Sequence, residues 1–264
     1  MEKPATRPER IWAGADGWAA SISAVLAGAV YFWTAAPNVT LLDSGEFLVA
    51  AQHLGVPHPT GYPLWTLLAW IFQLLPLGNA AWEINLFSGL CGASATGLAA
   101  ALFSSSTRWM LGERITRWRG LNFMAAVSVA LLFAFSASMW SQAVIAEVYT
   151  LHALLIGMFL ASLYAWLRRP ESLSLLMTPF FLLALSFSNH QLSVALAPLP
   201  LLAVLLVRRE IFWDLVGASA ITLLIVFLGF AILSEEMPVL KTGIRLFYCV
   251  AAGFVALVVL KKFR

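Results

Sequence analysis

Charged residues are scarce in this chain of 264 residues, because they make up only 11% of the sequence. A soluble domain carries about 25% charged residues, which keep its surface solvated. Hydrophobic residues account for 61% of this chain, and its mean hydropathy is +0.86. The shortage of charge excludes a soluble globular protein and predicts an all-helical integral membrane protein with several spans.

Cysteine is also scarce, since the only two, Cys91 and Cys249, both lie within apolar runs. This placement excludes a disulfide framework and a thiolate metal site. The formal net charge is +3, but the basic residues form short clusters between apolar runs, as topology signals do. We therefore expect no nucleic-acid partner.

Three common catalytic motifs are absent from the sequence: the H-E-x-x-H zinc site, the G-x-S-x-G elbow and the phosphate-binding G-x-x-x-x-G-K-[ST] loop. His53 and His58 are five residues apart with Pro57 between them, so they do not share a helical face. No metal site is predicted from these residues.

Apolar runs and basic clusters together predict how the chain crosses the membrane. The runs cover residues 18–36, 84–107, 121–140, 148–167, 173–207, 215–233 and 244–260. All Lys and Arg residues except Lys241 and Arg245 lie in clusters at the ends of these runs. If positive charge stays in the cytoplasm, an even number of crossings separates every two clusters.

This parity decides two ambiguous segments. Residues 62–77 reach only about 22 Å as a helix and are bracketed by prolines, so we expect a juxtamembrane helix there. Residues 173–207 must turn back at their only polar point, 186–191. The prediction is a single transmembrane domain, 1–264, with eight spans, both termini inside, and an extracytoplasmic loop at 37–83. The alternative for residues 18–36 is a cleaved signal peptide instead of the first span. Their apolar core is longer than that of a typical signal peptide.

Under this topology, many ionisable and polar residues from distant parts of the chain meet on the extracytoplasmic side. They are Asp43, Glu46, His53, His58, Tyr62, Glu83, Glu147, Tyr149, His152, Asn189, His190, Glu235 and Glu236. Ionisable groups at or within spans are costly to bury, which makes them candidates for a functional site.

Structural explanations compete for several of these residues. Asp43 and Glu46 have the spacing of a capping box that opens a helix near Phe47. Glu147 precedes a span, where the helix dipole favours a carboxylate. His152 falls one turn further in and is more typical of a core histidine than of a ligand.

The stretches "DSGEFLVAAQHLGVPHPTGYPLW", "AEVYTLHALL" and "SFSNHQLSVALAP" resemble the bacterial branch of the protein O-mannosyltransferase superfamily. These are membrane glycosyltransferases of the GT-C fold. The resemblance covers roughly residues 18–207 and is strongest in the first extracytoplasmic segment, with its acidic motif, His-Pro turn and interfacial helix. Members usually continue into more spans and a soluble C-terminal portion, which we expect this chain to lack.

The resemblance implies transfer of a mannose-like sugar from a polyprenyl-phosphate donor to an acceptor hydroxyl of a protein or glycan. It implies Asp43 as the catalytic base and Glu46 as the reserve base or acceptor-orienting group. His58, Tyr62 and His190 would bind the phosphate, because a phosphate leaving group needs hydrogen bonds more than a strong acid. Another set would line the sugar or acceptor side: Glu147, Tyr149 and Asn189. Related enzymes often use Arg or Lys for the phosphate, and here only Lys241 and Arg245 lie on that side.

The implied location is a bacterial cytoplasmic membrane, with the active site facing outside or the periplasm. No cofactor other than the lipid-linked sugar is implied, and the remaining partner is membrane lipid. A transporter or lipid flippase is the main alternative, although its polar residues would be spread through the spans. A non-catalytic membrane scaffold is a third possibility.

Overall fold

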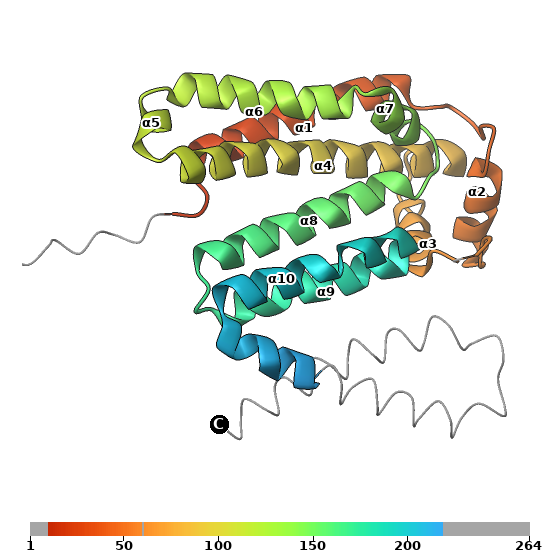
Figure 1. Ribbon diagram of the computed structural model, residues 1–264. Coiled ribbons are helices and arrows are strands. Elements are labelled where there is room, and N and C mark those ends of the chain that lie inside the picture. The colour runs from red at the N-terminus through yellow and green to blue at the C-terminus, as the bar shows by residue number, and fades with distance from the viewer. Residues whose placement is uncertain (1–9, 60, 219–264) are drawn as a thin grey trace, which may run out of the picture.

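The computed structural model describes residues 10–59 and 61–218, and every regular element in these ranges is a helix. The longer helices pack side by side as a bundle, and α2 and α3 lie at one end of it (Figure 1). The bounds are α1 Gly14–Thr34, α2 Ser44–His53, α3 Pro63–Phe72, α4 Ala80–Leu111, α5 Glu113–Thr116, α6 Arg119–Ala134, α7 Ala137–Ala143, α8 Tyr149–Arg168, α9 Leu173–Asn189, the 3-10 helix η1 Gln191–Leu196 and α10 Pro198–Val207.

The predicted count of eight spans is not confirmed. Within the described ranges, α1, α4 and α8 are long and apolar enough to cross a membrane. Helices α6 and α7 would form a fourth span together, but they are bent by 67° at their break. Ser136 causes a new helix to start there, because its Oγ accepts from the backbone N–H of Met139. Of the last two predicted spans, 215–233 lies mostly and 244–260 entirely outside the described residues.

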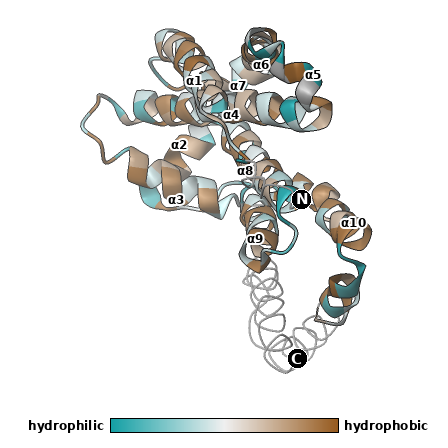
Figure 2. Cartoon of the chain, turned by 90° about the vertical axis from the view of Figure 1, so that its left-hand side faces the viewer, coloured by the Kyte–Doolittle hydropathy of each residue, from teal (hydrophilic) through white to brown (hydrophobic). Residues whose placement is uncertain are grey.

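The two ambiguous segments fold as helices too short to span. Helix α9 ends at Asn189 and η1 begins at Gln191, so the break predicted at 186–191 is confirmed. Helices α9 and α10 stand apart in Figure 2, and both contribute to one apolar core with α8. With 17 residues, α9 reaches about 25 Å, less than the roughly 30 Å of a hydrocarbon core. Helix α3 has only 10 residues, and its placement at the interface stays a prediction.

Small residues bring α1 and α4 close together. A Cβ atom added to Gly97 would lie 2.8 Å from the carbonyl oxygen of Ala20 and 3.0 Å from the Cβ of Ala24. A Cβ added to Gly92 would lie 3.2 Å from the ring of Tyr31. Membrane helices associate through such close approaches because lipid provides no hydrophobic drive.

Large apolar side chains point outward from the bundle. Trp33 is 87% exposed, Leu132 is 75% exposed and Val25 is 68% exposed. Brown, hydrophobic residues accordingly appear on the outer surfaces of the helices in Figure 2. Exposed apolar surface of this extent is costly in water and is suited to lipid. The chain is therefore an integral membrane protein.

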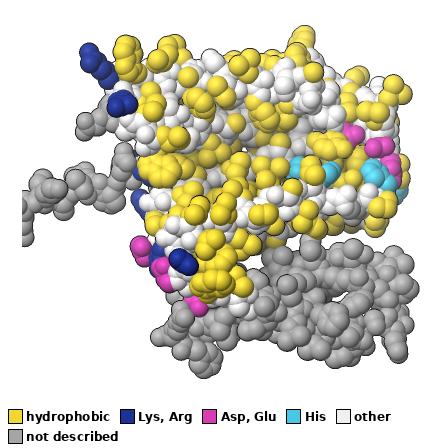
Figure 3. Space-filling model, in the orientation of Figure 1, with side chains coloured by type: hydrophobic (Ala, Val, Ile, Leu, Met, Phe, Trp, Pro, Cys, Tyr) yellow, Lys and Arg dark blue, Asp and Glu magenta, His cyan; other side chains and the backbone are white. Residues whose placement is uncertain are grey.

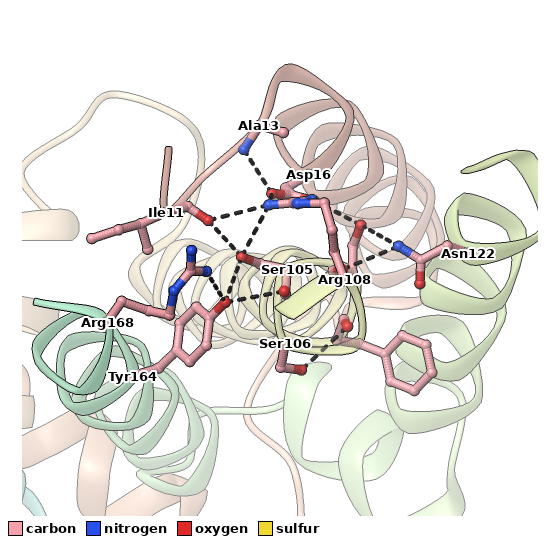
Figure 4. A network of polar contacts seen from close by, with 11 residues as sticks. Ile11, Ala13, Asp16, Ser105, Ser106, Arg108, Asn122, Tyr164 and Arg168 are labelled. Atoms are coloured by element: carbon pink, nitrogen blue, oxygen red, sulfur yellow. Dashed lines mark hydrogen bonds and ion pairs between the residues drawn. The ribbon is translucent and has the colours of Figure 1, made fainter. Parts of the chain in front are cut away.

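A polar network joins one end of the bundle (Figure 4). Both carboxylate oxygens of Asp16 accept from Arg108, each at 2.7 Å. Ser105 bonds both Arg108 and Tyr164, and Asn122 reaches the same end of α4. The starts of α1 and α6 and the ends of α4 and α8 thus meet, as the parity of basic clusters predicted. On the face shown in Figure 3, Lys and Arg gather at this end.

An apolar core supports the opposite end of the bundle. Phe47 of α2 and Trp65 of α3 pack with Ile84 and Phe87 of α4 and with Leu155 of α8. Burying one such aromatic or aliphatic side chain stabilises the fold by about 1.5–3 kcal/mol. This core fixes α2 and α3 against the long helices, and in Figure 3 the histidine side chains and one group of acidic side chains lie toward this end.

Candidate active site

The start of α2 presents an uncapped carboxylate. Asp43 is the N-cap residue, as predicted, but its side chain bonds no backbone N–H of the helix. The predicted capping box is wrong, because Glu46 turns toward His58 instead of its own N-cap. Ser44 holds the helix start by donating to the carbonyl of Ala146 at 3.3 Å. The exposed carboxylate of Asp43 thus has no capping role.

Left-handed backbone is concentrated around this helix. Leu42 has φ of 66°, Leu54 has φ of 49° and Tyr62 has φ of 42°. Each such conformation costs a residue other than glycine roughly 1–3 kcal/mol and persists only where the surroundings impose it. All three lie within residues 42–62, directly beside the candidate side chains.

Glu46, His58 and Tyr62 form a chain of hydrogen bonds. One oxygen of Glu46 accepts from the backbone N–H of His58 at 2.6 Å, and the other lies 3.0 Å from its Nδ1. The Nε2 of His58 lies 3.2 Å from the hydroxyl of Tyr62. The hydrogen bonds from His58 hold the pKa of Glu46 below its usual value. Glu46 therefore stays ionised and points into the site.

Tyr62 connects this chain to the rest of the site. It is 8% exposed, begins α3 as its N-cap and packs edge-on against Phe47. Burial raises the pKa of its hydroxyl, and Tyr149 and Glu147 raise it further, followed by Asp43 and Glu46. These groups therefore share one electrostatic environment although they come from distant parts of the sequence.

The connector 144–148, between α7 and α8, is fastened by side chains of several helices. The carbonyl of Glu147 accepts from the indole N–H of Trp65 at 3.0 Å and from Ser88 at 3.4 Å. The Ser88 hydroxyl also accepts from the N–H of Glu147. Asn189 donates to the carbonyl of Val148 at 3.2 Å. The connector thus has a fixed shape without being helical.

Glu147 is a buried acid, only 4% exposed. Burial raises its pKa to about 7, and the nearby charge of Asp43 adds to this rise. A hydrogen bond from the backbone of Val148 and the charge of His58 act in the opposite direction. Glu147 is therefore an acid whose proton is exchangeable near neutral pH.

A second group of rings lies beside Tyr149. The ring of His190 lies 5.5 Å from that of Tyr149 and 4.9 Å from that of His152. Its Nδ1 accepts from the backbone N–H of Leu192, so a neutral His190 carries its proton on Nε2. His152 is buried and lies 3.5 Å from the hydroxyl of Ser186, which agrees with its expected place in the core.

The structure brings most predicted site residues to one end of the bundle. The start of α2 is surrounded by Asp43, Glu46, His58 and Tyr62. The charge of Glu147 acts on the Tyr62 hydroxyl, and the charges of Asp43 and His58 act on Glu147. Tyr149 and His190 continue the group, because the rings of Tyr62 and His190 lie 6.1 Å apart. Asn189 is fully buried and holds Val148, with its own Oδ1 left without a partner.

Sequence reasoning missed the residues that hold the connector. Ser44, Trp65 and Ser88 each bond a carbonyl of the connector 144–148. Nothing in the sequence distinguishes Ser88 from the other small residues of α4. Lys241 and Arg245, the predicted basic residues on this side, lie outside the described residues.

Comparison with known proteins gives the family. A model of the protein O-mannosyl-transferase TMEM260 N-terminal domain matches residues 43–213, well over half of the chain. The match begins at Asp43 and includes every candidate site residue. The chain belongs to this family. No solved structure matches it.

Two curated relatives carry the same description. The mouse protein O-mannosyl-transferase TMEM260 is 38% identical over 120 residues, which are 45% of this chain and 15% of the mouse protein. The Dictyostelium discoideum protein O-mannosyl-transferase tmem260 is 31% identical over 143 residues, or 53% of this chain and 16% of that protein. The chain therefore matches only about one sixth of each relative's length. The resemblance seen in the sequence is confirmed at the level of the family.

Proposed function

We propose that this chain forms the membrane-embedded catalytic part of a protein O-mannosyltransferase with a GT-C fold. It would transfer a mannose-like sugar from a polyprenyl-phosphate donor to a hydroxyl of a protein or glycan on the extracytoplasmic face. The names of the mouse and Dictyostelium relatives support a mannosyl transfer to protein. The location in a bacterial cytoplasmic membrane is part of the proposal as well. It rests on the sequence resemblance alone, because both of these relatives come from eukaryotes.

The uncapped carboxylate of Asp43 is the observation that carries the proposal. It is exposed at the start of the family-matched region, beside Glu46 and His58. In the reaction, the acceptor oxygen attacks the anomeric carbon, the bond from that carbon to the phosphate oxygen breaks, and Asp43 takes the hydroxyl proton. The products are the glycoside and polyprenyl phosphate.

The surroundings of Asp43 suit a lipid-linked donor. Residues 39–42, which directly precede Asp43 in the chain, line an apolar hollow together with Ile145. The phosphate leaving group would receive hydrogen bonds from the Tyr62 hydroxyl and the Nε2–H of His190, whereas His58 would orient the Tyr62 hydroxyl. Glu147 and Tyr149 would then face the sugar or the acceptor.

A transfer assay with the purified chain and radiolabelled polyprenyl-phosphate mannose tests the proposal. We expect Asp43→Asn to reduce product formation by at least about 100-fold, as loss of a general base does. Glu171→Gln serves as the matched control, because Glu171 is an exposed acid that pairs with Arg208 rather than with site residues. Unchanged transfer by Asp43→Asn would remove Asp43 from the mechanism.

The same preparation distinguishes the alternatives. Proteoliposomes that move the lipid across the bilayer without forming glycoside would favour a flippase. Absence of both activities in every preparation, together with a stoichiometric protein partner, would favour a scaffold. Either result would overturn the proposed transferase.

A further inference from the structure

Three side chains of metal-ligand type converge at the start of α2. Asp43 and Glu46 come from the first turn of the helix and His58 from the loop after it, and their ligand atoms all lie within 4.8 Å of one another. Carboxylate oxygen and imidazole nitrogen are ligands that divalent metals accept in proteins. The spacing of His53 and His58 gave no hint of this set, because Glu46 and not His53 faces His58.

The contact between Glu46 and His58 has a separation suited to one type of cation. Their Oε2 and Nδ1 atoms are 3.0 Å apart. Two metal bonds of about 2.1 Å that end on these atoms would meet at an angle near 90°, as in an octahedral site. A tetrahedral zinc site would need a separation of about 3.4 Å. The pair is therefore compatible with an octahedral cation, and the two carboxylates of the set favour one of the Mg²⁺ and Mn²⁺ class.

Neighbouring groups already support these two ligands. The second oxygen of Glu46 is held by the backbone N–H of His58 at 2.6 Å. With a cation on Nδ1, His58 keeps its proton on Nε2. From there it donates a hydrogen bond to the Tyr62 oxygen, which lies 3.2 Å away. A hydrogen bond on the other ring nitrogen is the usual support of a metal-bound histidine. Asp43 is exposed and can rotate toward the cation.

Glu147 is a buried acid near these three side chains. Its side chain is 4% exposed, accepts a hydrogen bond from the backbone of Val148 and bonds no other side chain among the described residues. It lies close enough to Asp43 and His58 to respond to their charge. In residues 10–59 and 61–218, no Lys or Arg forms an ion pair with Asp43, Glu46 or Glu147. Buried carboxylates are usually paired or bind metals.

We propose that Asp43, Glu46 and His58 bind one divalent cation of the Mg²⁺ or Mn²⁺ class, with Glu147 as a nearby counter-charge. One oxygen of Asp43 binds the cation, and its other oxygen faces the acceptor. The cation would also neutralise the donor phosphate, a role that rests on the proposed transfer reaction. Binding of the cation itself does not depend on that reaction.

Titration of the EDTA-treated, purified full chain with MnCl₂ tests the site, with free Mn²⁺ measured by electron paramagnetic resonance. We expect one saturable site per chain. Glu46→Gln and His58→Gln should each weaken binding by at least about tenfold. His53→Gln is the matched control, because His53 is an exposed histidine of the same helix outside the ligand set. Gel filtration checks that each variant is folded.

The results separate this inference from the proposed function. No saturable binding up to about 1 mM Mn²⁺ would overturn the cation site, since that is the weak end of cation affinities. Equal affinity in Glu46→Gln, His58→Gln and His53→Gln would overturn it too. Saturable Mn²⁺ binding without any sugar transfer would instead uphold the site and count against the transferase. Sugar transfer that EDTA leaves unchanged, in a chain that binds no Mn²⁺, would uphold the transferase and overturn the cation site.

Discussion

Removal of the Asp16 charge should destabilise the bundle strongly. Asp16 is 1% exposed and accepts two hydrogen bonds from Arg108, one from Ser104 and one from the backbone of Ala13. Asp16→Asn would remove the carboxylate charge that pairs with Arg108 across the bundle, and breaking a buried pair in this way costs about 3–5 kcal/mol. The Arg108 side chain is 20% exposed, so we expect the lower end, about 3 kcal/mol.

Thermal unfolding of the purified protein in detergent measures this loss. At 2–4 °C per kcal/mol for a chain of this size, the midpoint should fall by about 6–12 °C. Glu171→Gln is the control, since Glu171 is 83% exposed in its pair with Arg208 and surface pairs contribute about 0–1 kcal/mol. Equal shifts in the two variants would refute the reasoning, because burial would then make no difference.

Two further variants test the buried acid and the close helix contact. The pKa of Glu147 is raised to about 7, so the folded chain holds a proton that the unfolded chain releases near pH 4.5. In EDTA, stability should therefore fall by about 3 kcal/mol at most as the pH rises through this window, and thermal unfolding of Glu147→Gln should lack this fall. Gly97→Ala should cost about 1–3 kcal/mol, because its Cβ would meet the Ala20 carbonyl. Gly120→Ala, with open space around its Cβ, should not lower the unfolding midpoint; equal losses in both would contradict the packing argument.

Helix positions could be predicted from the sequence wherever an apolar run was long. The polar break at His190 was predictable because the only Asn, His and Gln of 173–207 are consecutive there, at 189–191. The bend before Ser136 was not, since a single serine in an apolar run marks no boundary by itself. The pairing of Asp16 with Arg108 was also hidden, because 92 residues separate them and no periodicity links them.

The meeting of the candidate side chains at one end of the bundle was predictable from the sequence, but the bonds between them were not. Charge parity brought Glu147 to the same side as Asp43, although the two are far apart in sequence. The pattern Asp43 to Glu46 favoured a capping box, whereas tertiary contact with His58 outweighed local capping. Capping is worth about 1 kcal/mol, which a pair of hydrogen bonds to one carboxylate can exceed.

The way the connector 144–148 is fastened makes the candidate site sensitive to distant changes. Helices α2, α3, α4 and α9 each anchor one of its carbonyls through a single side chain. A slide of any of these helices along its axis would pull on that anchor and displace the Glu147 carboxylate. Substitutions deep in the bilayer would then alter the proposed sugar transfer without approaching any substrate, and lipid thickness would act on the candidate site by the same route.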